Sequence, residues 1–128
     1  MTKEIQWLLE RADESLQAAE LTLNNRLFHS SVSKAYYAMF YAAQALVLSK
    51  GKNAATHKGV LTQFSALFIK TGEVDRSYGV MLARAFAARG KADYEIGVEI
   101  TEQEAGQSLA DARSFLSMAS RLVSGTNE

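Results

Sequence analysis

The 128-residue sequence contains no cysteine and no proline, and each absence excludes something. Without cysteine the chain can form no disulfide, no thiolate metal site and no cysteine nucleophile. Because proline is the residue that most strongly interrupts a helix, its absence favours long, unbroken helices. The N-terminal segment also lacks the apolar run of a signal peptide and the roughly 20 apolar residues of a membrane span. We therefore expect a soluble, cytoplasmic protein that does not contact a membrane.

The composition is that of an ordinary globular domain, with 48% hydrophobic and 22% charged residues. These values exclude a disordered tail or a collagen-like repeat. A chain of this length can bury one sizeable hydrophobic core without a disulfide or a metal ion. We therefore expect a single domain over residues 1–128.

Charge is distributed unevenly along the chain, although the net charge is zero. Residues 1–33 carry a formal charge of −2, residues 34–91 carry +7, and residues 92–128 carry −5. The basic middle could form a surface that attracts phosphate, or the acidic ends could neutralise it when they pack on it. The sequence leaves both interpretations open.

Apolar residues recur every three or four positions in several segments, which predicts amphipathic helices. The apolar stripes run over Ile5–Leu23, Phe28–Leu46, Val60–Phe68, Tyr78–Ala92 and Ala105–Val123. The second segment, expected over residues 28–49, carries two such stripes, so we expect it to be covered on two sides and to lie at the centre. The pattern predicts an all-α fold, an antiparallel up-and-down bundle of four to five helices.

The predicted helices also carry signals at their ends. Thr56 is a plausible N-cap for the third helix, and Thr101 with Glu104 forms a capping box for the last one. Between the last two helices, residues 94–100 alternate apolar and polar side chains as a strand does. A lone strand is unstable, so we expect an extended connector that lies against the bundle.

Familiar chemical motifs are missing from the sequence. It has no glycine-rich phosphate loop, no histidines and carboxylates at the spacing of a metal site, and no nucleophile elbow with a catalytic serine. We therefore expect no metal and no cofactor. What distinguishes the chain is a set of polar side chains on otherwise apolar helical faces. They are Lys34, Tyr36, Tyr37 and Tyr41 in the second helix, Arg89 and Asp93 near the end of the fourth, and Tyr94 just after it.

The C-terminal end of the fourth helix offers a candidate anion site. The guanidinium of Arg89 suits phosphate or carboxylate, and Asp93 lies one turn later, where it can hold that group in place. The same pair can instead be an ion pair that only fixes the helix end. Tyr94 likewise fits either a ligand cleft or the core, with its hydroxyl hydrogen-bonded.

The remaining candidates lie in the second helix and at the start of the third. Tyr37 and Tyr41 can stack on nucleobases or pack against neighbouring helices. Lys34 shares their stripe but is by default a surface residue. His57 can bind a ligand or cap its helix.

Three segments together resemble the HEPN (higher eukaryotes and prokaryotes nucleotide-binding) domain family over nearly the whole chain. They are the run SVSKAYYAMFYAAQALVL, the histidine that opens ATHKGVLTQFSALF, and the ending ARGKADYE. The resemblance implies a helical bundle that forms a homodimer and is often encoded beside a minimal nucleotidyltransferase in a toxin–antitoxin-like module. It also implies that several branches are metal-independent ribonucleases, in which an arginine is followed after four to six residues by a histidine at the dimer cleft.

This chain keeps the arginine, Arg89, but has Tyr94 after four intervening residues and Ile96 after six. Tyrosine, with a pKa near 10, is a poor proton shuttle at neutral pH. We therefore expect a non-catalytic component that binds a nucleotide, RNA or a nucleotidyltransferase through Lys34, Tyr37, Tyr41, His57 and Arg89. The alternatives are a divergent ribonuclease using Arg89 with Tyr94, Asp93 or His57, and a structural homodimer without a ligand.

Overall fold

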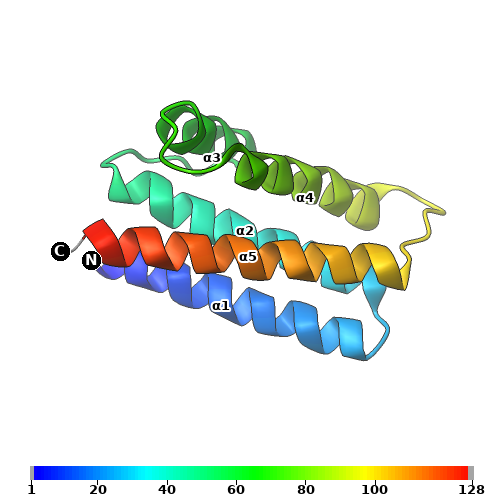
Figure 1. The fold of residues 1–128 in the computed structure, drawn as a ribbon. Coiled ribbons are helices and arrows are strands. Elements are labelled where there is room, and N and C mark those ends of the chain that lie inside the picture. The colour runs from blue at the N-terminus through cyan, green and yellow to red at the C-terminus, as the bar shows by residue number, and fades with distance from the viewer. Residues whose placement is uncertain (1, 127–128) are drawn as a thin grey trace.

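The computed structural model describes residues 2–126 and confirms the all-α fold (Figure 1). Over these residues it contains five α-helices and one π-helical turn, with no strand. The elements are α1 (Lys3–Asn24), α2 (Phe28–Ser49), α3 (His57–Phe64), η1 (Ser65–Ile69), α4 (Arg76–Tyr94) and α5 (Glu102–Thr126).

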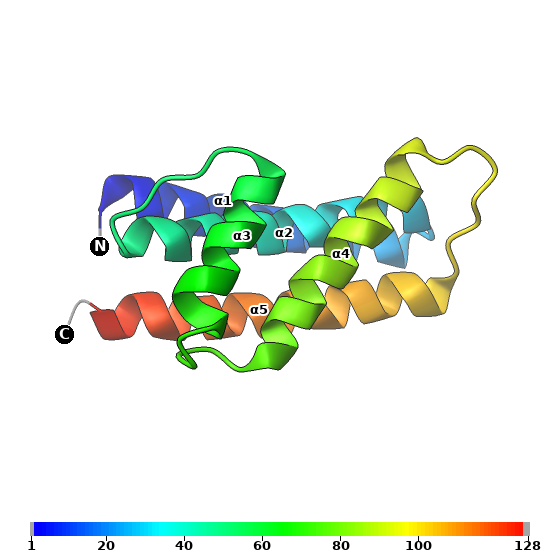
Figure 2. The ribbon, with the colours of Figure 1, turned by 90° about the horizontal axis from the view of Figure 1, so that it is seen from above.

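The three long helices α1, α2 and α5 lie side by side, and α3 and α4 form a V across α2 and α5 (Figures 1 and 2). Along the bundle, α1 and α4 run in one direction while α2 and α5 run in the other. Helix α2 packs against α1, α3, α4 and α5, which confirms its predicted central position.

The helix ends follow the signals in the sequence. Thr56 Oγ1 accepts a hydrogen bond from the Gly59 backbone N–H at 3.0 Å, and Thr101 Oγ1 accepts one from the Glu104 N–H at 3.1 Å. Helix α2 has the predicted bounds, and Gly51 follows its end with a positive φ of 76°, a conformation that glycine adopts without a steric cost. Local signals therefore set where α3 and α5 begin.

Helix α2 is largely buried between Ser31 and Val47. Its buried positions are Ser31, Val32, Ala35, Tyr36, Ala38, Met39, Phe40, Ala42, Ala43, Ala45, Leu46 and Val47. The two apolar stripes of this helix are covered within one chain, as the sequence predicts. The α3–α4 layer covers the side of α2 that α1 and α5 leave open.

The connector between α4 and α5 lies against the bundle only over its last part, from Val98 to Ile100. Tyr94 is the last residue of α4, not part of an extended segment, and it is 70% exposed. Ile96 is fully exposed, whereas Ile100 is buried with Val32 and Ala105. The alternation over residues 94–100 therefore marks a connector that leaves the bundle and returns to it.

Candidate functional site

Arg89 is the centre of a polar and aromatic cluster where the C-terminal half of α4 meets α2. Its side chain is only 13% exposed. Nη2 donates hydrogen bonds to the hydroxyl of Tyr37 at 2.7 Å and to that of Tyr94 at 3.1 Å. The guanidinium carbon lies 5.8, 5.3 and 5.1 Å from the ring centroids of Tyr36, Tyr37 and Tyr94, respectively. Three tyrosines thus surround one cation.

Asp93 completes the surroundings of Arg89 one helical turn later. Its Oδ2 lies 3.1 Å from Arg89 Nε and accepts a hydrogen bond from Ser33 Oγ at 3.1 Å. The Nε–H of Arg89 is buried and not aimed at an acceptor, so the contact is an ion pair without a hydrogen bond. Within residues 2–126, Nη1 of Arg89 makes no hydrogen bond either. That nitrogen is the donor left for a ligand.

His57 joins the cluster from the start of α3. Its Nδ1 lies 2.6 Å from the hydroxyl of the buried Tyr36, within hydrogen-bond distance. The imidazole packs against Phe40 and Phe86, with ring centroids 4.6 and 6.1 Å away. Since Tyr36 also lies under the guanidinium of Arg89, this tyrosine links the histidine to the arginine.

The cluster sets the protonation of its members. Burial lowers the pKa of His57, and the charge of Arg89 lowers it further, so the imidazole is neutral at neutral pH. Burial raises the pKa of Tyr36 well above its usual range, although Arg89 opposes the shift. Burial also tends to lower the pKa of Arg89, but Tyr37, Tyr94 and Asp93 more than offset this and raise it. The site thus combines a fixed cation, a protonated phenol and a neutral imidazole.

The structure brings most of the predicted site residues together. Direct contacts with Arg89 come from Tyr37, Asp93 and Tyr94. Tyr41 lies one turn further along α2, with its ring 6.2 Å from that of Tyr37. Lys34 is exposed and forms no ion pair within the described part of the chain, so nothing links it to the cluster.

Two residues of the cluster, Ser33 and Tyr36, are absent from the set of site residues predicted from the sequence. Tyr36 is noted there as a polar residue on an apolar face, and the Tyr36–Tyr37 pair was the available signal. Only the structure shows that Tyr36 points inward and reaches His57. For Ser33 the sequence carries no signal.

The basic middle of the chain is neutralised only in part. Three of its nine cations form ion pairs: Lys50 with Glu73, Arg84 with Asp111 and Arg89 with Asp93. The other six are exposed and form no ion pair among residues 2–126: Lys34, Lys52, Lys58, Lys70, Arg76 and Lys91. The acidic C-terminal segment therefore neutralises two of the nine, and most of the positive charge stays at the surface.

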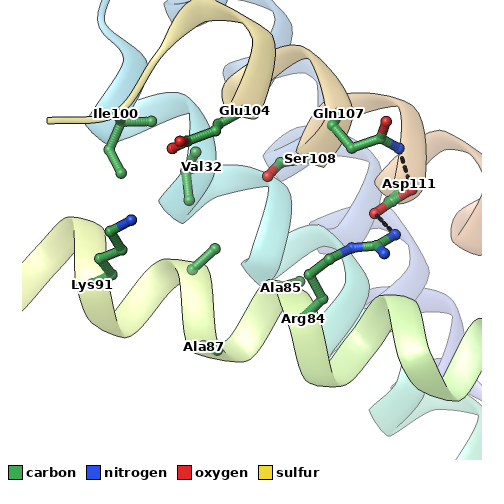
Figure 3. A pocket seen from close by; sticks show the side chains of 11 residues that line it. Val32, Arg84, Ala85, Ala87, Lys91, Ile100, Glu104, Gln107, Ser108 and Asp111 are labelled. Atoms are coloured by element: carbon green, nitrogen blue, oxygen red, sulfur yellow. Dashed lines mark hydrogen bonds and ion pairs between the residues drawn. The ribbon is translucent and has the colours of Figure 1, made fainter.

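A hollow with a volume of about 350 Å³ lies between α4 and α5 (Figure 3). Its lining includes the apolar side chains Val32, Ala85, Ala88 and Ile100. At one end Asp111 accepts hydrogen bonds from Arg84 at 2.6 Å and Gln107 at 2.9 Å, so both of its oxygens are occupied. At 100° per residue, Arg89 points to another side of α4. The hollow is therefore separate from the Arg89 cluster.

Residues 2–126 contain neither a cluster of metal-binding side chains nor a membrane-spanning helix. No group of three or more histidine, aspartate or glutamate side chains there is placed to hold a metal ion. None of the helices in this range is both long and apolar enough to cross a membrane.

Comparison with known proteins identifies relatives along almost the whole chain. The family model that matches is the HEPN domain, over residues 5–122. "Putative toxin MJ0605" of Methanocaldococcus jannaschii is 38% identical over 114 residues, which cover 89% of this chain and 84% of that protein. A "UPF0332 protein" of Thermotoga maritima is 38% identical over 121 residues, or 94% and 92% of the two chains. "Putative toxin MJ0142" of M. jannaschii is 36% identical over 125 residues, or 98% and 85%. The resemblance seen in the sequence is confirmed.

Proposed function

Because the chain belongs to the HEPN domain family, we propose that it is the RNA- or nucleotide-binding component of a two-component, toxin–antitoxin-like module. The names of the two M. jannaschii relatives support a module of this kind. The role is non-catalytic, and the Arg89 cluster holds a phosphate group of the bound molecule. The partners are a second copy of the chain and a cognate minimal nucleotidyltransferase.

The observation that carries this proposal is the arrangement around Arg89. Its Nη2 is fixed by two tyrosine hydroxyls, and its guanidinium is surrounded by three aromatic rings. A cation held in this way loses little side-chain entropy on binding, which favours phosphate recognition by the remaining donor, Nη1. The six unpaired cations of the middle segment add long-range attraction for a polyanion.

Binding of a short single-stranded RNA, followed by fluorescence anisotropy, tests the proposal. We expect Arg89→Ala to weaken binding about tenfold or more, because it removes a charge-assisted contact to phosphate. The wild-type affinity should also fall steeply with salt, since phosphate contacts release counterions. Arg113→Ala is the matched control, because Arg113 is a half-exposed arginine whose one ion pair among the described residues is with Glu20, across α1 and α5. Absence of binding at low ionic strength, or equal binding by both variants, contradicts the proposal.

A second candidate function, a divergent ribonuclease, is favoured by one observation: His57 lies beside Tyr36 in the same cluster as Arg89. A neutral imidazole can accept the proton of an attacking 2′-hydroxyl, and an arginine can stabilise the charge that builds up on the phosphate. The Tyr94 hydroxyl, hydrogen-bonded to Arg89, is the nearest candidate for the position that histidine takes in the ribonuclease branches.

Substitution of Tyr94 separates the two functions. If the protein is a binding component, the wild type leaves RNA intact in the presence of a chelator. Tyr94→His should then create a weak cleavage that Arg89→Ala removes, since general acid–base catalysis is worth about 10² to 10⁴ in rate. Cleavage by the wild type that is lost in both Arg89→Ala and His57→Gln, with helicity unchanged by circular dichroism, would establish the ribonuclease instead.

A further inference from the structure

A row of aromatic rings continues from the Arg89 cluster across α2 to α1. The rings of Tyr37 and Tyr41 have centroids 6.2 Å apart, and the next ring, Trp7, lies 6.5 Å from Tyr41. Trp7 is in α1, and no motif in the sequence marks it as a site residue. The row therefore connects α1 to the site on α2 and α4.

The outer end of this row carries a second arginine in surroundings similar to those of Arg89. The guanidinium carbon of Arg11 lies 5.7 Å from the ring centroid of Trp7 and 5.8 Å from that of Tyr41. As in Arg89, its Nε is buried and has no acceptor among residues 2–126. Its Nη1 donates to Glu14 at 2.8 Å, and its Nη2 makes no hydrogen bond within the described residues. The side chain is 41% exposed, so this end group can reach a ligand.

Trp7 is more exposed than a tryptophan that serves only to fill the core. It is the single tryptophan of the chain, and 56% of its surface is exposed. Its ring meets Tyr41 edge-on, at an interplanar angle of 85°. A large, rigid aromatic surface is thus presented to solvent beside a cation.

Alternating aromatic rings and arginines are the combination that binds single-stranded nucleic acid. Bases stack on the rings without strong sequence preference, while the cations contact the phosphates. We propose that Trp7 and Arg11 form a second subsite, which binds an unpaired nucleotide of the same RNA strand whose phosphate lies at Arg89. This inference rests on the proposed function and specifies its ligand as a single strand longer than one nucleotide.

The two subsites contribute different kinds of energy. Residues 1–33 have a net charge of −2, and Arg11 is already paired with Glu14, so the contribution at Trp7 is mainly stacking. The contribution at Arg89 is mainly electrostatic. Removal of Trp7 should therefore lower the affinity at every salt concentration and leave the salt dependence of binding almost unchanged. Removal of Arg89 should instead make the salt dependence of binding weaker.

The fluorescence of Trp7 reports directly on this subsite, because no other tryptophan is present. Titration with a single-stranded RNA of about eight nucleotides, within the range of known single-strand sites, should quench it saturably. AMP, which is too short to span both subsites, should bind at Arg89 and leave the fluorescence unchanged. Arg89→Ala should shift the titration to higher RNA concentrations and keep the quenching at saturation.

Affinity measurements on variants complete the test. Trp7→Ala should weaken binding of this RNA about 5- to 150-fold, the range for one base stacked on an aromatic ring, and Trp7→Phe should retain most of the affinity. Leu21→Ala is the matched control, since Leu21 is a similarly exposed apolar side chain on the same helix. It should bind as the wild type does.

The outcomes distinguish this inference from the function on which it rests. RNA binding that depends on Arg89, with unchanged Trp7 fluorescence and wild-type affinity in Trp7→Ala, overturns the second subsite and leaves the proposed function intact. Quenching that is indifferent to Arg89→Ala contradicts phosphate binding at Arg89, and with it both the proposed function and a single strand that spans the two subsites. A change in sedimentation of Trp7→Ala without RNA would mean that Trp7 contacts a second copy of the chain, which also overturns the inference.

Discussion

Arg89 is stabilised mainly by tyrosines, although a carboxylate lies next to it. Its Nη2 donates to the hydroxyls of Tyr37 and Tyr94, while its Nε, beside Asp93, has no hydrogen-bond acceptor in the part of the chain that the structure describes. A buried polar atom without a partner costs about 1–3 kcal/mol. The cluster therefore holds the guanidinium in one orientation but leaves it incompletely satisfied, which suits a group that binds an anion.

His57 should make the protein less stable in mild acid. Burial and the charge of Arg89 lower its pKa in the folded state below the 6.5 of an unfolded chain. Between these two values the unfolded state binds more protons than the native state, so the free energy of unfolding falls as the pH falls. Urea unfolding from about pH 7.5 to about pH 5.5 should show a decline that His57→Gln makes shallower.

The second histidine supplies the control for this pH dependence. His29 is exposed at the start of α2, and its Nε2 contacts the backbone oxygen of Val98 at 2.8 Å, away from Arg89. His29→Gln should therefore not reproduce the effect of His57→Gln. An identical pH dependence in the wild type and in His57→Gln would show that the imidazole is not shielded from water.

At the scale of single elements, the start of α3 depends on one close approach. Thr56 caps the helix through its hydroxyl, which accepts the backbone N–H of Gly59. A Cβ added to Gly59 would lie 2.7 Å from that hydroxyl oxygen, closer than the two atoms can pack. The cap therefore requires glycine at position 59. The cap also sets where α3 begins, and His57 is the first residue of this helix.

Gly59→Ala should consequently raise the free energy of unfolding less than a glycine-to-alanine change elsewhere in a helix. Replacing a helical glycine by alanine ordinarily stabilises by about 0.5–1 kcal/mol, and Gly106→Ala in α5, where a Cβ meets nothing within 4 Å, should do so. In Gly59→Ala the lost cap costs about 0.5–2 kcal/mol, which offsets that gain. Chemical denaturation measures both changes.

A double substitution tests the reason for this difference. In a Thr56→Ala background the hydroxyl is gone, so Gly59→Ala should become stabilising, as Gly106→Ala is. If Gly59→Ala destabilises the protein equally with and without Thr56, a different contact is responsible and the role assigned to the cap is wrong.

The elements that could be predicted from the sequence are those specified by local signals. The bounds of α2 follow from two apolar stripes and a terminal glycine, and the start of α5 follows from Thr101. The π-helical turn η1 continues α3 without any signal in the sequence, because a change of hydrogen-bond register does not alter the apolar spacing. The exposure of Ile96 was also missed, since alternation does not say whether a segment is packed against anything.

The site was predictable to a similar extent. Arg89, Asp93 and Tyr94 lie within six residues of one another, so their proximity follows from helical spacing and the family motif. The contact of His57 with Tyr36, and of Trp7 with Tyr41, joins residues 21 and 34 positions apart. Such contacts depend on how helices cross, which periodicity does not specify.

At the scale of the whole molecule, the fold leaves an apolar surface beside the site, not along α2. Ile96 is fully exposed, and its neighbour Tyr94 is 70% exposed while it hydrogen-bonds Arg89. Both side chains can therefore be covered by a partner without any rearrangement of the bundle. The family resemblance places the arginine at a dimer cleft, so we expect a second copy of the chain to cover this connector.

Sedimentation equilibrium at micromolar concentration should therefore show a homodimer, and Ile96→Glu should shift it to monomer, because a carboxylate buried at an interface is costly. Val80→Glu is the matched control, since Val80 is an apolar side chain of similar size exposed on another side of α4. A monomeric wild type contradicts the dimer itself. If Val80→Glu dissociates the dimer and Ile96→Glu does not, the protein is a dimer whose interface lies on the outer face of α4. Arg89 would then not lie at the contact between the two copies.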